Sequence, residues 1–278
     1  MLETAKKELL HWIQERECVR VKKESGKPKP WTNDPVLRDY KFCNVLREDD
    51  RVSRWVQREW LAPNDGSPNF AFAACMARHF NWPDTLQLIG FPSGSSFDSQ
   101  DVKERIKYAR DKRGAKIYTG AYTVSTCGRS MDKVDYSIDI VLAPMFKVIR
   151  NPKKGESVQE YWKYLQQFEG FSSFMAGQVV ADLKMFAPLN TAPDCWSWAP
   201  LGPGSIRGLN RMYDRKLTAP LKQEEGLKML LNIQEIIRTG LSMNMPLHNV
   251  QNCLCEFDKY MRLKYDGGKV RSKYPGAA

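Results

Sequence analysis

The sequence predicts a mainly α-helical protein with at most a short β segment. Apolar residues recur at helical spacing over most of the chain, and only residues 116–124 have strand-like content. Stretches rich in Gly and Pro separate the helical patterns. The 278 residues are 42% hydrophobic and 27% charged, as in a globular protein with a real core.

The helical patterns follow one another along the chain. The first covers residues 2–17, where Leu, Trp and Ile alternate with Lys and Glu. Gly and Pro at 26–30 break the chain, and a second helix begins at Asp49 or Asp50 and ends at Trp60. Further helices are expected over residues 69–80, 99–113, 157–168, 172–186, 205–214, 223–240 and 247–264.

The remaining segments set the expected domain organisation. Residues 116–124, flanked by glycines, are expected to form a short hairpin or an extended crossing segment. We expect one helical unit over residues 1–278, with two lobes that meet near 140–155 as the alternative. Residues 266–278 form a basic, Gly-containing arm that we expect to be mobile or ordered by a partner.

The charge balance favours an anionic partner. The formal net charge is +11, from 43 Lys and Arg against 32 Asp and Glu, and nucleic acid is the commonest partner of such a surplus. The seven cysteines are an odd, scattered set, which indicates a reducing compartment. The sequence shows neither a signal peptide nor an apolar run of membrane-spanning length, so we expect a cytoplasmic protein.

Several common chemistries are excluded by missing motifs. The chain has no phosphate-binding P-loop and no glycine-rich dinucleotide fingerprint after a strand. His11, His79 and His248 are too dispersed for a zinc site or a histidine-based triad, so we expect no metal site. Catalysis, if present, therefore depends on carboxylates, Lys, Arg and Tyr.

A dense charged stretch occurs at residues 42–55. Arg47, Asp50, Arg51 and Arg54 lie three or four positions apart and would share one side of a helix. Such residues could form an arginine clamp for phosphate, with the carboxylates fixing the guanidinium planes. The alternative is a solvated surface that pairs its own charges.

Two further carboxylate patterns stand out. Asp182 is the single charge in the apolar segment 174–183, so it needs either a partner, such as an Arg, or a catalytic task. Glu256 and Asp258 cannot share a helical face, but they lie at helical spacing from Tyr260 and Arg262. Local ion pairing explains the second pattern, and an acid–base role would require a cleft.

A glycine turn precedes the predicted helix that carries Arg207 and Arg211. Leu201-Gly202-Pro203-Gly204 is followed by Ser205, which could cap the helix, and by Gly208. The free N–H groups at such a helix start suit a phosphate, and the pattern has the form of a helix-hairpin-helix turn, which DNA glycosylases use to hold a backbone phosphate. The alternative is a plain Gly/Pro loop between two helices.

These motifs together resemble one family, the helical proteins of bacteriophage thymine hypermodification. That family includes the 5-hydroxymethyluracil DNA kinase helical domain, and the α-glutamyl/putrescinyl-thymine pyrophosphorylases or amino-acid:DNA transferases. The resemblance runs from about residue 10 to the C-terminus. It is carried by NVLREDDRVSRW at 44–55, NWPDTL at 81–86, GAY at 120–122, FMAGQVVADL at 174–183, GPGSIRGLNR at 202–211 and CEFDKY at 255–260.

The resemblance implies a DNA-glycosylase-like helical architecture and a DNA-modifying transferase. A separate P-loop kinase would convert 5-hydroxymethyluracil in DNA to its pyrophosphate ester, and this chain would replace the pyrophosphate with an amine or amino acid. The base must leave the stack and lie between aromatic walls. The implied catalytic residues are Asp182 as proton acceptor, Asp258 or Glu256 as second choices, and Arg47, Asp50, Arg51 and Lys259 around the pyrophosphate. The implied DNA-binding residues are Gly202, Gly204, Ser205, Arg207 and Arg211, and the base-pocket residues are Trp55, Trp82, Tyr122 and Trp198.

The partners and alternatives follow from the same resemblance. The partners would be double-stranded DNA with a modified thymine, the amine or amino-acid donor and a P-loop DNA kinase, in the cytoplasm of an infected bacterium. No cofactor is indicated, although a divalent cation could accompany the pyrophosphate. One alternative is a glycosylase for a modified pyrimidine, with Glu224 and Glu225 after the hairpin; another is a non-catalytic DNA-binding subunit of the kinase.

Overall fold

The computed structural model describes residues 1–269, 273 and 274. The chain divides into two compact units, which are described separately here. The first unit consists of Met1–Asp50 and Trp196–Ala278, and the second is Arg51–Cys195. The chain region near 140–155 therefore lies inside the second unit, and a glycosylase-like arrangement stays a prediction.

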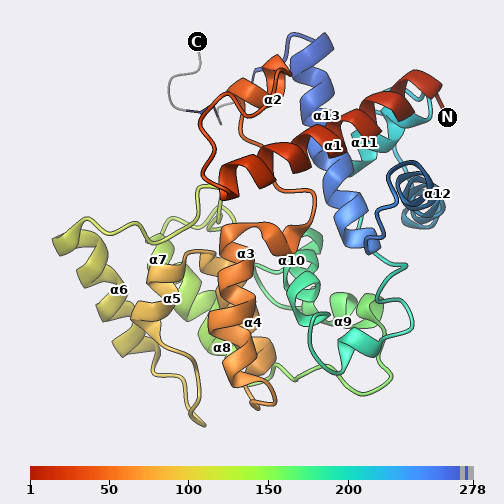
Figure 1. Ribbon diagram of the computed structural model, residues 1–278. Helices are drawn as coiled ribbons and strands as arrows, with labels where there is room; N and C mark the ends of the chain where they lie inside the picture. Colours follow the sequence, from red (N-terminus) through yellow and green to blue (C-terminus); the bar gives the residue numbers. More distant parts are fainter. Residues whose placement is uncertain (270–272, 275–278) are drawn as a thin grey trace. The chain divides into compact units, whose positions relative to one another are not determined.

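The first unit is built from helices at both ends of the chain (Figure 1). Helix α13 contacts α1, α2, α11 and α12, so it is the central element of this unit. The helices are α1 (Glu3–Glu24), α2 (Pro35–Asp39), the short 3₁₀ helix η1 (Arg47–Asp49), α11 (Pro203–Met212), α12 (Gln223–Leu241) and α13 (Leu247–Tyr265).

Apolar faces of these helices meet in one core. Residues with no exposed surface come from α1, α11, α12 and α13, as the amphipathic spacing requires. They include Leu9, Trp12, Ile13, Leu209, Ile233, Ile237, Val250, Leu254 and Phe257. The burial of these side chains holds the two distant chain segments together.

The second unit packs helices around α4, all of whose residues are buried. Helix α4 contacts α5 and α10, and α10 also contacts α9. Two of its helical stretches are π-helices, η2 and η4, which are rare and frequently occur at functional sites. The elements are α3 (Arg51–Trp55), η2 (Val56–Leu61), η3 (Ala62–Asn64), α4 (Phe70–Phe80), α5 (Pro83–Ile89), α6 (Ser99–Arg113), α7 (Lys133–Asp135), η4 (Tyr136–Leu142), α8 (Ala143–Phe146), α9 (Val158–Leu165), α10 (Ser173–Leu183) and η5 (Leu189–Thr191).

The predicted helical class is confirmed, and of the two forms expected for residues 116–124 the hairpin is not formed. That segment is irregular and runs past the end of α4, where the Thr119 N–H donates to the Phe80 carbonyl at 3.0 Å. Thr85 Oγ1 donates to the Ile117 carbonyl at 2.8 Å. Packing against α4 and α5 therefore satisfies backbone groups that a hairpin would have paired.

The expected helix starting at Asp49 or Asp50 is also corrected. Arg47–Asp49 form a 3₁₀ turn, Asp50 is extended, and α3 begins at Arg51. Arg47 and Asp50 consequently belong to the first unit and Arg51 to the second, rather than to one helical side.

The C-terminal arm lies only partly within the described residues, because 270–272 and 275–278 fall outside them. The Tyr274 N–H donates to the Asp39 carbonyl at 2.9 Å, and Lys273 pairs with Tyr40 in an isolated bridge. The described part of the arm is therefore ordered by α2 of its own unit. Within the part of the chain that can be searched, no helix has the length and apolarity to cross a membrane.

Candidate functional site

Three arginines surround one buried carboxylate in the first unit. Asp258 has no exposed surface; Arg207 Nε donates to its Oδ2 at 2.8 Å, and Arg211 Nε donates to its Oδ1 at 3.0 Å. Arg262 lies on the same carboxylate at 3.4 Å, one helical turn along α13. We call Arg207, Arg211 and Arg262 around Asp258 the arginine cluster. It carries more positive than negative charge, with three guanidinium groups around one carboxylate.

Exposure differs within the arginine cluster. The side chains of Arg207 and Arg262 are each 37% exposed, whereas that of Arg211 is 10% exposed and also pairs with Asp266. A guanidinium has five N–H donors in a planar fork, and the bond from Arg207 to Asp258 uses only Nε. Asp258 therefore orients two partly exposed arginines, and its pairing with them does not favour Asp258 as a proton acceptor.

Other predicted site residues gather where the segment before η1 crosses α13. The Cys43 N–H donates to Glu256 Oε2 at 3.0 Å, and Lys259 Nζ lies 3.3 Å from the same oxygen. The Asn44 N–H donates to Asp50 Oδ1 at 3.1 Å. We call Cys43, Asn44, Arg47, Asp50, Glu256 and Lys259 the Asp50 cluster. The structure thus brings together four residues predicted to be catalytic.

Arg16 of α1 holds this segment in place. Only 7% of Arg16 is exposed, and its guanidinium donates to the Cys43 carbonyl at 3.0 Å, to the Phe42 carbonyl and to Asn44 Oδ1. Because a buried guanidinium must be hydrogen-bonded, this contact fixes the backbone that carries the Asp50 cluster. The sequence gives no signal for Arg16, because a lone Arg on an amphipathic helix normally lies at the surface.

Asp50 is the carboxylate with a perturbed proton affinity. Burial raises the pKa of Asp50, and the nearby Glu256 carboxylate acts in the same direction. The hydrogen bond from Asn44 and the charges of Arg47 and Arg16 oppose this rise in the pKa. Asp50 therefore binds a proton more tightly than an exposed aspartate does.

The glycine turn starts α11. Gly204 in the turn and Gly208 farther along the helix serve helix packing. A Cβ at Gly204 would lie 2.3 Å from Cys255 Sγ, and one at Gly208 would lie 2.4 Å from the Leu254 carbonyl oxygen. These two glycines therefore allow α11 to approach α13 closely. The role of Gly204 in phosphate binding stays a prediction; the side of Gly204 where a Cβ would stand packs against Cys255.

Ser205 is not the N-cap that the sequence suggested. Pro203 is the first helical residue, Gly202 is the N-cap, and the Gly202 N–H donates to Ser205 Oγ at 3.0 Å. Proline starts a helix readily because its φ is already helical and its missing N–H is not needed there. Ser205 is fully buried, so its hydroxyl closes the turn rather than facing solvent.

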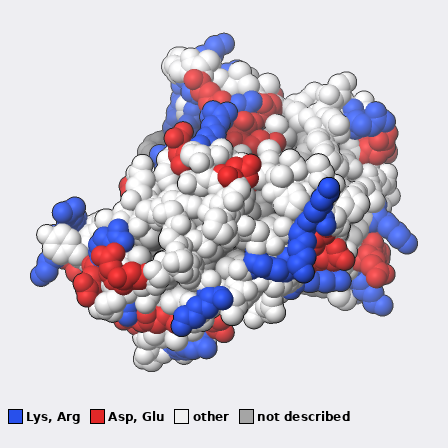
Figure 2. All heavy atoms as spheres, turned by 90° about the horizontal axis from the view of Figure 1, so that it is seen from below, with Lys and Arg blue, Asp and Glu red and all other residues white. Residues whose placement is uncertain are grey.

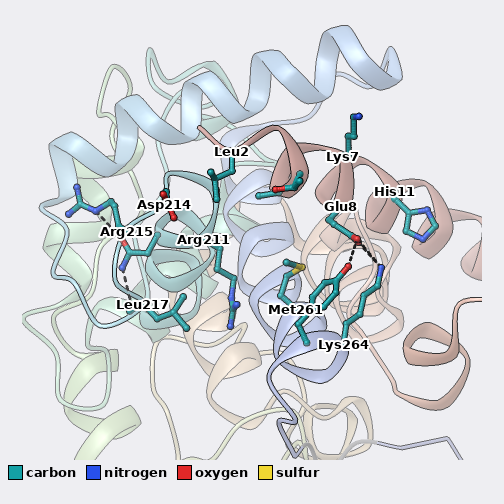
Figure 3. Close-up of a pocket in the computed structure, with 14 residues that line it drawn as sticks. Leu2, Lys7, Glu8, His11, Arg211, Asp214, Arg215, Leu217, Met261 and Lys264 are labelled. Carbon is teal, nitrogen blue, oxygen red and sulfur yellow. Dashed lines mark hydrogen bonds and ion pairs between the residues drawn. The ribbon is translucent and has the colours of Figure 1, made fainter.

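A cavity of about 860 Å³ lies in the first unit between α1, α11 and α13 (Figure 3). Lys7, Arg211, Arg215 and Lys264 contribute positive charge to its wall, and Glu8 accepts hydrogen bonds from Lys264 Nζ and Tyr265. Arg211 thus belongs both to the arginine cluster and to this cavity. The basic wall extends the anion-attracting character of the first unit.

In the second unit, Asp182 is paired with Arg78. Both side chains are almost fully buried, and Arg78 Nε and Nη2 donate to the two carboxylate oxygens. Arg78 also donates to Asn81 Oδ1 and to Ser53 Oγ, each at 3.0 Å. Of the two interpretations weighed for Asp182, the structure shows the carboxylate tied to an arginine, and this pairing does not favour its use as a base.

The four predicted base-pocket aromatics come from both units, and a shared pocket stays a prediction. Trp198 is buried in the first unit, where its ring meets His248 edge to face. In the second unit, Trp55 stacks on Trp60, and Lys116 Nζ lies 3.9 Å from the Trp82 ring centroid. Tyr122 lines a cavity of about 460 Å³ in the second unit.

The net positive charge is not gathered on the face drawn in Figure 2. There, Lys and Arg lie beside Asp and Glu in mixed groups around a broad uncharged area. Glu225, a residue of the glycosylase alternative, is likewise paired, with Arg215 at 2.8 Å. Among residues 1–269, 273 and 274, no group of three or more His, Cys, Asp and Glu side chains could hold a metal ion. Anion binding by this protein would therefore depend on particular arginines and not on the charge of this face.

Comparison with known proteins identifies the family. The model of the 5-hmdU DNA kinase helical domain matches residues 3–269. The chain belongs to this family. The resemblance inferred from the motifs is therefore confirmed, and the protein is a helical domain of a family of phage thymine hypermodification.

A curated relative shows the same relationship. The 5-hmdU DNA kinase of Bacillus phage SP10 is 27% identical over 213 residues, which cover 68% of this chain and 33% of that protein. The chain thus spans about a third of the length of this relative. No solved structure shows significant similarity to the chain.

Proposed function

We propose that this helical domain binds DNA carrying 5-hydroxymethyluracil or its pyrophosphate ester, and that the arginine cluster contacts the DNA phosphates. The observation that supports this proposal is the buried Asp258 carboxylate, which orients exposed Arg207 and Arg262 on adjacent helices. Oriented guanidinium forks suit phosphate better than flexible lysines do. Phosphate contacts would position the domain without reading sequence.

A binding experiment with matched arginine variants tests this proposal. We expect Arg207→Gln and Arg262→Gln each to weaken binding to a 5-hydroxymethyluracil duplex, and to reduce the slope of log affinity against log salt by about 1. Arg238→Gln in the same unit is the control, because the Arg238 side chain is 56% exposed and pairs with the similarly exposed Glu235. Fluorescence anisotropy across a salt series would measure both quantities. Equal salt slopes for all variants would contradict the proposal.

We further propose a transferase reaction, supported by the raised pKa of Asp50. The amine nitrogen of the donor forms a bond to the 5-methylene carbon, and the carbon–oxygen bond to pyrophosphate breaks. Pyrophosphate leaves with the bonding electron pair and is stabilised by Arg47 and Lys259. The proton lost by the incoming ammonium passes to the Asp50 carboxylate. A P-loop kinase, in an infected bacterial cell, would supply the pyrophosphate ester, and a divalent cation could accompany the leaving group.

Nucleoside mass spectrometry tests this reaction. We expect pyrophosphorylated DNA, incubated with the protein and amines or amino acids, to lose the pyrophosphate and gain the mass of one donor. Asp50→Asn should reduce the rate about 100-fold or more, because the base is removed while the side-chain volume is kept. In the wild type the rate should fall as the pH drops through the raised pKa of Asp50, since the protonated carboxyl cannot accept a proton.

Other outcomes separate the alternatives. Asp182→Asn is the matched control, and it should leave the rate per folded molecule unchanged. Abasic sites in the product would support the glycosylase alternative instead. DNA binding without any change in base mass would support a non-catalytic domain that serves a kinase.

A further inference from the structure

We propose that the cavity of the second unit holds the flipped-out 5-substituted uracil base, and that His79 Nδ1 accepts a hydrogen bond from its N3–H. The inference rests on the proposed binding of DNA that carries a modified uracil, and it is independent of the proposed reaction at the Asp50 cluster. Figure 1 shows α4, which carries His79 near its C-terminal end, within the second unit. His79, Tyr122, Gln166, Gln167, Gly170 and Phe174 are among the residues that line the cavity.

His79 is a buried histidine with one ring nitrogen in use. Its Nε2 lies 2.9 Å from Ser137 Oγ, whereas its Nδ1 is buried and has no hydrogen-bond partner in the described chain. Buried polar atoms are nearly always paired, and an unpaired one costs free energy. A missing partner at a cavity wall therefore points to a ligand.

We assign the hydrogen of the neutral His79 ring to Nε2. Ser137 Oγ donates to the Lys133 carbonyl at 2.8 Å, and with its one hydrogen used in this way it accepts from His79 Nε2–H and from the Tyr118 hydroxyl, which lies 2.7 Å away. Ser137 lies in the π-helix η4, whose wider turn carries it to this position. In this tautomer Nδ1 has a lone pair and can only accept a hydrogen bond.

Burial also keeps the ring neutral. It lowers the pKa of His79 to about 4, so at pH 7 the ring is neutral and the acceptor at Nδ1 persists. The other polar side chains of the cavity wall include Gln166 and Gln167, whose amide groups have N–H donors for carbonyl oxygens; one Gln166 N–H already donates to the Trp162 carbonyl at 3.2 Å. A wall with one acceptor and several amide donors matches the groups at the edge of uracil, where N3–H lies between two carbonyls.

The rest of the wall suits a planar base. Tyr122 and Phe174 meet edge to face with centroids 5.3 Å apart, so they give this wall an aromatic surface. Gly170 has φ of 79°, and a Cβ there would lie 4.0 Å from His79 Cε1, the atom between the two ring nitrogens. Gly170 thus places only backbone in front of the imidazole edge. A volume of about 460 Å³ is within the range of small-ligand sites.

The proposed hydrogen bond would discriminate between pyrimidines. Cytosine has an acceptor at N3, which would face the Nδ1 lone pair, and N3-methylation of uracil removes the donor altogether. We expect the wild-type chain to bind a duplex with one 5-hydroxymethyluracil at least about tenfold more tightly than duplexes with 5-hydroxymethylcytosine or N3-methyl-5-hydroxymethyluracil. Fluorescence anisotropy with the full chain measures this preference.

Two substitutions of His79 separate recognition from folding. His79→Gln can keep the contact to Ser137 but has no acceptor at the Nδ1 position, so the preference should fall to about onefold with backbone binding retained. His79→Asn can place an oxygen near the Nδ1 position and should retain part of the preference. An undiminished preference in folded His79→Gln would overturn the inference.

A second measurement does not depend on DNA binding. The histidine ¹⁵N spectrum of the full chain should show the Nδ1 resonance of His79 moving on addition of the nucleoside 5-hydroxymethyldeoxyuridine, and not on addition of its N3-methyl analogue. If the duplexes fail to bind but this shift occurs, the proposed function fails and the base site stands. If the duplexes bind and neither the shift nor the base preference occurs, the base site fails and the proposed function stands.

Discussion

Replacing Asp182 with alanine is expected to lower the free energy of unfolding by about 3–5 kcal/mol. The substitution would leave the Arg78 guanidinium, which is 3% exposed, without its carboxylate partner. Arg78 would keep its bonds to Asn81 and Ser53, but neither neutralises the charge. Urea unfolding monitored by circular dichroism measures the change.

A matched carboxylate on the surface provides the control. Asp101 pairs with Arg105 one turn along α6, with exposed fractions of 54% and 40%. Asp101→Ala should therefore change stability by no more than about 1 kcal/mol. The double substitution Arg78→Met with Asp182→Leu should recover much of the loss, because no unpaired charge then remains buried. A loss for Asp182→Ala no larger than that for Asp101→Ala would disprove the account of this pair.

Gly208→Ala is expected to lower the free energy of unfolding by about 3 kcal/mol or more, as overpacking of a core does. The added methyl group would lie 2.4 Å from the carbonyl oxygen and 2.9 Å from the carbonyl carbon of Leu254, atoms of the α13 backbone that cannot turn aside. Helices α11 and α13 would have to separate. Because these helices carry the arginine cluster, the same change should also weaken DNA binding.

Gly202→Ala is the matched control for this prediction. The nearest atom to a Cβ at Gly202 is Gln251 Nε2, at 4.0 Å, which is an ordinary contact. Gly202→Ala should lower the free energy of unfolding by less than about 1 kcal/mol, mainly because a favourable N-cap residue is lost. Thermal and urea unfolding of both variants would compare them; similar costs would show that close helix packing is not the reason for Gly208.

Much of the helical organisation follows from local sequence. The prediction of a helix over 99–113 agrees with α6 (Ser99–Arg113), because Asp98 caps its start and Gly114 ends it in a left-handed conformation. The prediction of a helix over 69–80 similarly agrees with α4 to within one residue. For segment 116–124 the sequence left two forms open, and the hairpin is absent because the backbone partners of the segment lie in α4 and α5 rather than in the segment itself.

The predicted site residues were identified by residue type, but their partners were not. Arg47, Asp50, Glu256 and Lys259 were predicted and do come together. Arg16, His79 and Arg262 were not predicted as site residues. Each acquires its importance from burial or from a contact with residues far away in the chain, and a local pattern carries no signal of that kind.

By itself, the sequence determined the helical class, most helix ends and the family, because helix periodicity, caps and motifs are local properties of the chain. Only the tertiary structure decided which groups surround each of the predicted carboxylates. Asp182 is bound to an arginine 104 positions away, Asp258 orients three arginines, and Asp50 acquires a raised pKa. The physical reason is that desolvation and ion pairing depend on which distant groups surround a side chain once the core has formed.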